Sequence, residues 1–133
     1  MKSYLLDTHG FLWALFNPDN LGQQARILLM NIDNTIYVSS ISFWEIALKF
    51  SMGKLHLEKC VPDELPSLAM RSGFLLLPLE AEEAAAFYHL PKQAHKDPFD
   101  RMLIWQAISR QLILISKDND LTAYNQYGLQ IIW

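Results

Sequence analysis

The sequence predicts a three-layer α/β fold, in which a central parallel sheet is flanked by helices on both faces. Short apolar segments alternate along the chain with longer segments of helical periodicity. The apolar segments are continuous rather than interrupted by polar residues, as is typical of strands covered on both faces. A length of 133 residues suits one domain, so we expect residues 1–133 to form a single domain.

The N-terminal part of the chain predicts one strand and two helices. Residues 2–6 form an apolar run typical of a buried strand. Asp7-Thr8 then supply side chains that cap helices well, and apolar residues within 11–16 follow at helical spacing. A turn at 17–20 leads to a second helix over 21–32.

The middle of the chain continues this alternation. The β-branched and aromatic run 35–38 predicts a second strand. We expect a helix over 43–51, which ends before Gly53, and another over 62–72. Gly73 is the residue type that commonly follows a helix C-terminus.

The C-terminal part predicts the remaining elements of the sheet. Residues 74–77 are expected to form a strand, and the alanine-rich, acid-started segment 80–89 a helix. Asp97-Pro98 opens a helix that runs to about Arg110, because proline suits the first helical position. Residues 112–115 are the most apolar strand, and 129–133 are expected to form a last strand at the sheet edge.

Composition excludes several classes of protein. Hydrophobic residues make up 51% of the chain and charged residues 19%, which is too apolar for a disordered protein. No apolar run reaches the roughly 18 residues that a membrane span needs, and Asp7 comes too early for a signal peptide. Cys60 is the single cysteine, so an internal disulfide is excluded. We expect a soluble, cytoplasmic domain with no membrane partner.

The charge balance argues against general binding to nucleic acid. The chain has 11 basic and 14 acidic residues and a net charge of −3, whereas proteins that hold nucleic acid mainly by neutralising phosphates tend to be basic. Any function on nucleic acid must therefore come from a local site.

Four carboxylates are expected to meet at one edge of the predicted sheet. Asp7 directly follows the first strand, and Asp118 comes shortly after strand 112–115. Glu45 is expected in the first turn of the helix after the second strand, and Asp100 in the first turn of its helix. The carboxyl ends of parallel strands share one edge, where ligands bind. Carboxylates without histidine or cysteine suit Mg²⁺ or Mn²⁺, which can activate water against a phosphodiester.

A purely structural interpretation of these acids stays open. Asp7, Asp97 and Asp118 stand where helix N-caps are wanted, and Ser42 to Glu45 fits a capping box. Asp100 lies where an acid complements the helix macrodipole. Cap positions after parallel strands lie on the same sheet edge in any case, so the residues alone do not decide between cap and site.

Several segments along the chain form an ordered set of motifs. They are Leu5-Leu6-Asp7-Thr8-His9, Val38-Ser39-Ser40-Ile41-Ser42-Phe43-Trp44-Glu45-Ile46-Ala47, Gly53-Lys54-Leu55, Gly73-Phe74 with Leu77-Pro78-Leu79, His95-Lys96-Asp97-Pro98-Phe99-Asp100-Arg101, and Ser116-Lys117-Asp118. With these motifs the chain resembles the PIN-domain ribonucleases, and most closely the VapC-type toxins of bacterial toxin–antitoxin modules. The motifs occur in the family's order and cover nearly the whole chain.

The resemblance implies a metal-dependent endoribonuclease that acts as the toxin of a type II toxin–antitoxin system. The family's catalytic and metal-binding acids carry over as Asp7, Glu45, Asp100 and Asp118, with Mg²⁺ or Mn²⁺ as cofactor and RNA as substrate. The family also implies a homodimer and a cognate antitoxin, whose C-terminal segment blocks the acidic groove.

Other residues are secondary candidates for the site. Asp97 belongs to the shared motif but is expected to be the N-cap, and Ser116 stands where the family more often has threonine. Asp120 is either near the metal or merely exposed. Some basic residues either form a positive rim around the metal that positions phosphates or are simply scattered over the solvated surface. These residues are Lys49, Lys54, Lys96 and Arg101. His9 and His95 are expected to be structural or solvated. The four tryptophans are expected in the core or an interface first, and as stacking platforms for RNA second.

Two other classes of function remain as alternatives. A receiver-like phospho-acceptor domain would share the parallel sheet and need an acid pair and a lysine after a late strand. Lys117 could supply that lysine, but no adjacent acid pair follows a strand. A non-catalytic interaction domain would use all its acids as helix caps.

Overall fold

The structure is a computed structural model that describes residues 2–93 and 95–133. Its centre is a five-stranded, all-parallel sheet with the strand order β3-β2-β1-β4-β5. The strands are β1 (Ser3–Leu6), β2 (Thr35–Ser39), β3 (Leu75–Leu77), β4 (Ile113–Ile115) and β5 (Gln130–Ile132). All five lie within the predicted segments or one residue beyond them, and β5 is at the edge, as predicted.

The helices connect these strands in the expected order. They are α1 (Thr8–Phe16), η1 (Pro18–Asn20), α2 (Gln23–Met30), α3 (Ser40–Ser51), η2 (Pro62–Glu64), α4 (Leu65–Arg71), α5 (Ala81–Ala85), η3 (Ala86–His89), α6 (Pro98–Arg110) and η4 (Asn119–Tyr127), where η marks a 3₁₀ helix. Gly73 follows α4 at φ +91°, the left-handed conformation that glycine adopts without strain.

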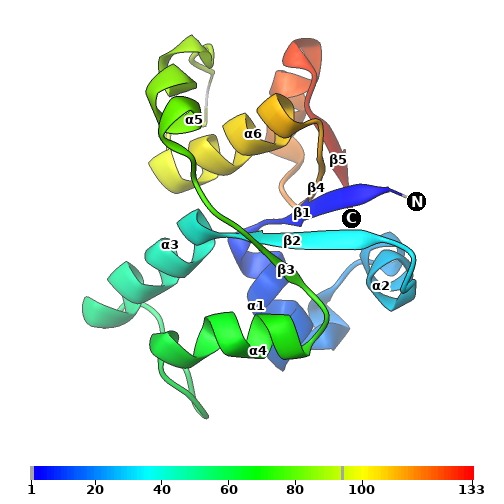
Figure 1. The fold of residues 1–133 in the computed structure, drawn as a ribbon, viewed down its shortest axis with the longest axis vertical. Helices are drawn as coiled ribbons and strands as arrows, with labels where there is room; N and C mark the ends of the chain where they lie inside the picture. The colour runs from blue at the N-terminus through cyan, green and yellow to red at the C-terminus, as the bar shows by residue number, and fades with distance from the viewer. Residues whose placement is uncertain (1, 94) are drawn as a thin grey trace.

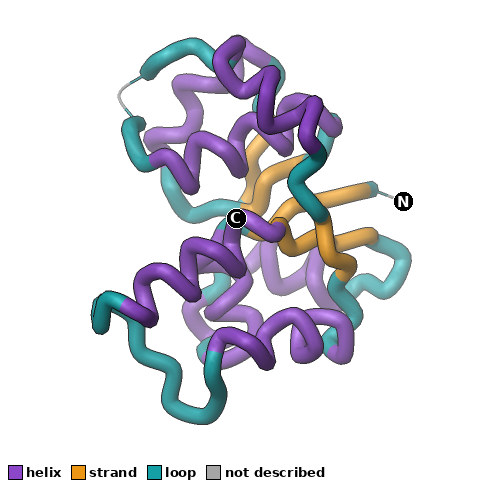
Figure 2. Tube along the Cα trace, turned by 60° about the vertical axis from the view of Figure 1, so that its left-hand side comes forward, coloured by secondary structure: helices purple, strands orange, loops and turns teal. Residues whose placement is uncertain are grey.

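Two hydrophobic cores lie on opposite faces of the sheet, which confirms the three-layer α/β fold. Tyr4 and Leu6 of β1 face a core that includes residues of α1, α2 and α4. Leu5, between them in the sequence, faces a second core with Leu114 of β4 and residues of α6 and η4. Figure 1 shows α1, α2 and α4 below the sheet and α5 and α6 above it. Figure 2 shows the strands enclosed between the same two groups of helices.

The start of α3 differs from the prediction. The Ser39 hydroxyl at the end of β2 accepts a hydrogen bond from the Ile41 N–H at 3.0 Å, and so caps the helix three residues earlier than expected. The predicted capping box from Ser42 to Glu45 is therefore wrong. Ser42 is fully buried within the helix, and Glu45 lies in its second turn rather than its first.

A buried polar network joins α5 to α6. Glu83 of α5 accepts hydrogen bonds from Arg110 Nε at 2.7 Å and from Gln106 Nε2 at 3.1 Å. Gln106, which is fully buried, also bonds through Oε1 to the Ser39 hydroxyl at 2.5 Å. Burial raises the pKa of Glu83, but the hydrogen bonds from Arg110 and Gln106 outweigh it and hold the pKa below its usual value. This network fixes α6 against the end of β2, where α3 begins.

Among the residues that the structure describes, no helix is both long enough and apolar enough to cross a bilayer.

Candidate metal centre

Asp7 lies between the end of β1 and the start of α1. Its backbone N–H donates to the Ile115 carbonyl at 3.1 Å and so continues the pairing of β1 with β4. Its side chain caps α1 by accepting the Gly10 N–H at 2.7 Å. A Cβ at position 10 would stand 2.8 Å from the Asp7 carboxylate oxygen, so this close approach requires glycine. The backbone therefore fixes the carboxylate at the carboxyl edge of the sheet.

The electrostatic environment of Asp7 disfavours its charge. Burial raises the pKa of the Asp7 carboxyl from 3.8 to about 6, and the nearby Asp100 carboxylate adds to the rise. Hydrogen bonds from the Gly10 N–H and the Ser116 side chain, and the charge of His9, oppose it without cancelling it. Burial therefore favours the neutral form of this carboxyl over a wider pH range than in an exposed aspartate.

Asp97 and Asp100 have different environments although they share one helical turn. The Asp97 carboxylate caps α6, because it accepts the Phe99 N–H at 2.8 Å and the Asp100 N–H at 3.2 Å. Asp100 is the third residue of α6, and its Oδ2 lies 2.8 Å from His95 Nε2. Burial raises the pKa of Asp100, as do the charges of Asp97 and Glu45, whereas the hydrogen bond with His95 lowers it.

Asp118 lies across the same edge, after β4. Its Oδ1 accepts the Asp120 N–H at 2.9 Å and caps η4, and its own N–H donates to the Ser116 hydroxyl at 3.2 Å. The other carboxylate oxygen lies 3.6 Å from His95 Nδ1. The His95 ring therefore stands between Asp100 and Asp118, a contact that the sequence did not indicate.

Glu45 reaches the site from α3 and is held by a small polar network. Only 3% of the residue is exposed. The Thr8 hydroxyl donates to Glu45 Oε1 at 2.7 Å, and the Ser42 hydroxyl lies 3.0 Å from Thr8 Oγ1. The Lys49 ammonium contacts Glu45 Oε2 from the next turn of α3. This hydrogen bond with Glu45 raises the pKa of Lys49. The sequence predicted Thr8 and Ser42 only as helix caps, so their contacts in this network were not expected.

Three of the four predicted acids line one cavity of about 140 Å³. Asp7, Asp100 and Asp118 are joined there by His9 and Ser116. Glu45 does not line this cavity, but its charge reaches Asp100. Asp120 is exposed at the start of η4.

The carboxylates as they stand are turned toward protein donors. Within residues 2–93 and 95–133, no three histidine, cysteine, aspartate or glutamate side chains are arranged to hold a metal ion directly. His95 and Lys49 occupy oxygens of Asp100 and Glu45 instead. The donor set nevertheless fits Mg²⁺ or Mn²⁺, because carboxylate and hydroxyl oxygens are the hard ligands that these ions prefer. Burial and the charges of neighbouring carboxylates raise the pKa of Asp7 and of Asp100, and a bound cation would offset both effects.

Three of the basic and aromatic candidates differ in their surroundings. Arg101 turns toward η3, with its guanidinium 3.2 Å from the Leu90 carbonyl and 4.9 Å from the centre of the Phe87 ring. Trp105 donates its indole N–H to the Glu83 carbonyl at 2.9 Å, as a structural residue would. Trp44, in contrast, is 61% exposed, with its ring against Phe99.

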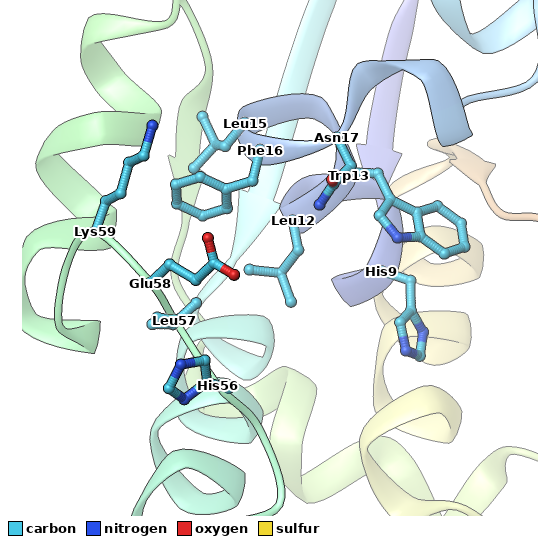
Figure 3. A pocket seen from close by; sticks show the side chains of 10 residues that line it. All are labelled: His9, Leu12, Trp13, Leu15, Phe16, Asn17, His56, Leu57, Glu58 and Lys59. Atoms are coloured by element: carbon cyan, nitrogen blue, oxygen red, sulfur yellow. The ribbon is translucent and has the colours of Figure 1, made fainter.

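A second, larger cavity of about 710 Å³ adjoins the acidic one through His9, which lines both. Residues of α1 form one wall and the segment 56–59 the other. Figure 3 shows His9 and Trp13 on one side, opposite Glu58 and Lys59. The Trp13 ring lies 5.6 Å from the His9 ring and 5.8 Å from the Lys117 ammonium. The acidic cavity therefore lies beside a larger cavity whose lining combines apolar side chains with charged side chains of both signs.

The fold and this edge define a three-layer α/β protein with an acidic pocket at the carboxyl ends of parallel strands. The family model of the PIN domain matches residues 4–126, so the chain belongs to the PIN-domain family. No match was found among curated proteins.

Several solved structures share the fold. VapBC2 from Rickettsia felis, bound to a DNA fragment from its promoter, is 20% identical with a TM-score of 0.65, covering 98% of this chain and 97% of that one. DNA-bound VapBC from Salmonella typhimurium is 19% identical with a TM-score of 0.65, covering 99% and 98%. VapBC-5 from Mycobacterium tuberculosis, of the VapBC family of toxin-antitoxin systems, is 17% identical with a TM-score of 0.58, covering 99% and 97%.

Proposed function

We propose that this PIN-domain protein is a Mg²⁺- or Mn²⁺-dependent endoribonuclease and the toxin of a type II toxin–antitoxin system. The observation that carries the proposal is the convergence of Asp7, Asp100 and Asp118 on one cavity at the carboxyl edge of the sheet. Helix capping accounts for the positions of Asp7 and Asp118, but it gives Asp100 no task, because Asp97 already caps that helix.

Asp7, Asp100 and Asp118, with Glu45 from the adjoining helix, are the residues that would hold the metal. A divalent ion held there would supply activation of water and charge stabilisation on the phosphodiester, and it would make the acidic pocket compatible with a polyanionic substrate.

The chain's own residues hold these ligands in place. Gly10 and Ser116 orient the Asp7 carboxylate, and Thr8 orients Glu45. Asp97 fixes the first turn of α6, from which Asp100 projects. The backbone around each ligand is thereby held in place, and metal binding would require His95 and Lys49 to release the oxygens of Asp100 and Glu45.

We further propose a cognate antitoxin and a homodimer. The structures of similar fold include complexes described as VapBC and FitAB, and the antitoxin of this chain would cover the acidic cavity. Co-purification with the product of the neighbouring open reading frame tests this partner, and a lone, monomeric protein in the presence of that product would contradict it.

The catalytic proposal is tested by incubating the purified protein with single-stranded RNA in Mg²⁺, in Mn²⁺ and in excess EDTA. We expect cleavage only with the metals, and none from an Asp100→Asn variant purified in the same way. Cleavage that persists in EDTA, or that Asp100→Asn retains in full, would contradict the metal-dependent mechanism.

A further inference from the structure

The ion pair between Glu45 and Lys49 places a flexible cation at the edge of the acidic site. Glu45 is almost fully buried, whereas about a third of the Lys49 side chain is exposed. Among the described residues, Lys49 is the side-chain cation paired with this carboxylate. A buried carboxylate needs such a partner, because removing its charge from water is costly.

The two oxygens of Glu45 have different partners. Oε1 is held by the hydroxyl of Thr8, which is itself buried, and Oε2 is held by Lys49. Of the two oxygens, Oε2 is the easier one for a metal ion to take, because its partner is the more exposed and more flexible of the two. Lys49 and a metal ion bound through Oε2 would compete for the same atom.

An ammonium released from Glu45 would remain close to the site. Lys49 lies within electrostatic reach of Asp97 and Asp100, and its stem is anchored on α3. A lysine ammonium is a compact charge with three donors on a flexible stem, so it can bind a phosphate oxygen at a site where RNA enters. Arg101, the basic residue that follows Asp100 in the sequence, is turned toward η3 instead.

We propose that Lys49 is a positioning residue that exchanges partners: it neutralises Glu45 in the metal-free protein and contacts the RNA backbone once Glu45 binds metal. The inference rests on the proposed function and deepens it, because it assigns one residue two opposite effects. Lys49 weakens metal binding by competition, and it strengthens RNA binding when metal is present.

Two binding measurements on Lys49→Met test this exchange. The first is the apparent Kd for Mn²⁺, measured by calorimetry without RNA. We expect the variant to bind Mn²⁺ at least about threefold more tightly than wild type, because no internal cation has to be displaced. The second is the Kd for a labelled 12-nucleotide single-stranded RNA, measured by fluorescence anisotropy in EDTA and in Ca²⁺, with gels to show that the RNA stays intact.

We expect the RNA measurement to depend on the metal. In Ca²⁺, Lys49→Met should bind RNA about three- to tenfold more weakly than wild type, and the slope of log K against log salt should fall by about 0.7, the value for one contact to a single strand. In EDTA the two proteins should bind RNA alike. Lys49→Arg, which keeps the charge, should restore RNA binding in Ca²⁺.

Matched controls separate this role from a general effect of charge or folding. Lys2→Met removes one positive charge at the opposite end of β1 and should change neither measurement. Lys49→Gln, which keeps a hydrogen-bond donor, serves if Lys49→Met does not fold.

Two results would overturn this inference but not the proposed function, provided that wild type binds Mn²⁺ and cleaves RNA. In the first, the neutral Lys49 variants bind Mn²⁺ no more tightly than wild type. In the second, they bind RNA in Ca²⁺ as tightly as wild type. A wild-type protein that neither binds Mn²⁺ nor cleaves RNA would overturn the proposed function, and this inference with it.

Discussion

The Thr8 hydroxyl donates a 2.7 Å hydrogen bond to the buried carboxylate of Glu45 and thereby joins the first turn of α1 to the second turn of α3. The two residues follow different strands of the sheet, β1 and β2, which are hydrogen-bonded neighbours. Asp7 immediately precedes Thr8. The hydrogen bond of Thr8 with Glu45 therefore ties the positions of two candidate metal ligands, Asp7 and Glu45, to each other.

Thr8→Val is expected to destabilise the protein. Valine keeps the shape of the side chain but leaves Glu45 Oε1 without its donor, and an unsatisfied buried acceptor costs about 1–3 kcal/mol. Urea unfolding in EDTA measures this loss. Thr122→Val is the matched control, because that hydroxyl is exposed and bonds only to the nearby Asn119 carbonyl. Equal stability of the two variants would show that the Thr8 contact is not formed.

Asp97→Asn and Asp100→Asn are expected to have different effects on activity. Asparagine caps a helix about as well as aspartate, so Asp97→Asn should keep the fold and most of the RNA cleavage. Asp100→Asn should keep the fold but reduce cleavage by at least about a hundredfold, which corresponds to roughly 2.7 kcal/mol in the barrier. Cleavage rates and circular dichroism of both variants check this. If the two outcomes are exchanged, the assignment of cap and ligand is wrong.

Asp7 is expected to make the metal-free protein less stable as the pH rises. Its folded pKa of about 6 lies above the usual 3.8, so the folded protein retains a proton that the unfolded chain has lost. Stability is therefore lost between about pH 4 and pH 6 and stays low above it. A shift of about two units corresponds to on the order of 2–3 kcal/mol.

Asp7→Asn should remove this effect while keeping an oxygen for the cap. In EDTA at pH 7.5 we expect it to melt roughly 3–8 °C above wild type, with a smaller difference at pH 4. Added Mn²⁺ should stabilise wild type more than the variant. A destabilised variant that is indifferent to metal would indicate that Asp7 acts only as a cap.

The ion pair of Glu83 and Arg110 is expected to support the fold independently of the site. The Glu83 side chain is 7% exposed and that of Arg110 30%. Arg110→Met leaves a mostly buried carboxylate without its cation, and should lower the free energy of unfolding at pH 7 by about 1–3 kcal/mol. The exposed pair of Arg26 and Asp19, 3.6 Å apart, supplies the control: Arg26→Met should change stability by less than about 1 kcal/mol. Equal losses would show that burial does not distinguish the two pairs.

The sequence predicted the sheet and the position of its acids because both follow from local rules. Asp7, Asp97 and Asp118 are N-caps in the structure, and Asp7 and Asp118 also line the acidic cavity. Cap and site were posed as alternatives, but a cap that follows a parallel strand is placed at the ligand-binding edge by the same geometry. No local pattern separates the two roles.

What the sequence could not provide depends on tertiary packing. The helix after β2 starts at Ser40 rather than near Phe43, because Ser39, which pairs with Leu77 of β3, caps it. Ser39 and Ser42 are equally good cap residues, so no local pattern decides between them. The contacts of Thr8 with Glu45, and of His95 with Asp100 and Asp118, likewise join segments whose proximity only the fold establishes.

The most direct test of the central claim, that Asp7, Glu45, Asp100 and Asp118 together hold a divalent metal, is a calorimetric titration of Mn²⁺ into wild type and the four single Asn or Gln variants. We predict measurable binding by wild type and at least about tenfold weaker binding by each variant, with circular dichroism unchanged. Failure of wild type to bind Mn²⁺, or binding by all four variants that is as tight as that of wild type, would contradict the claim.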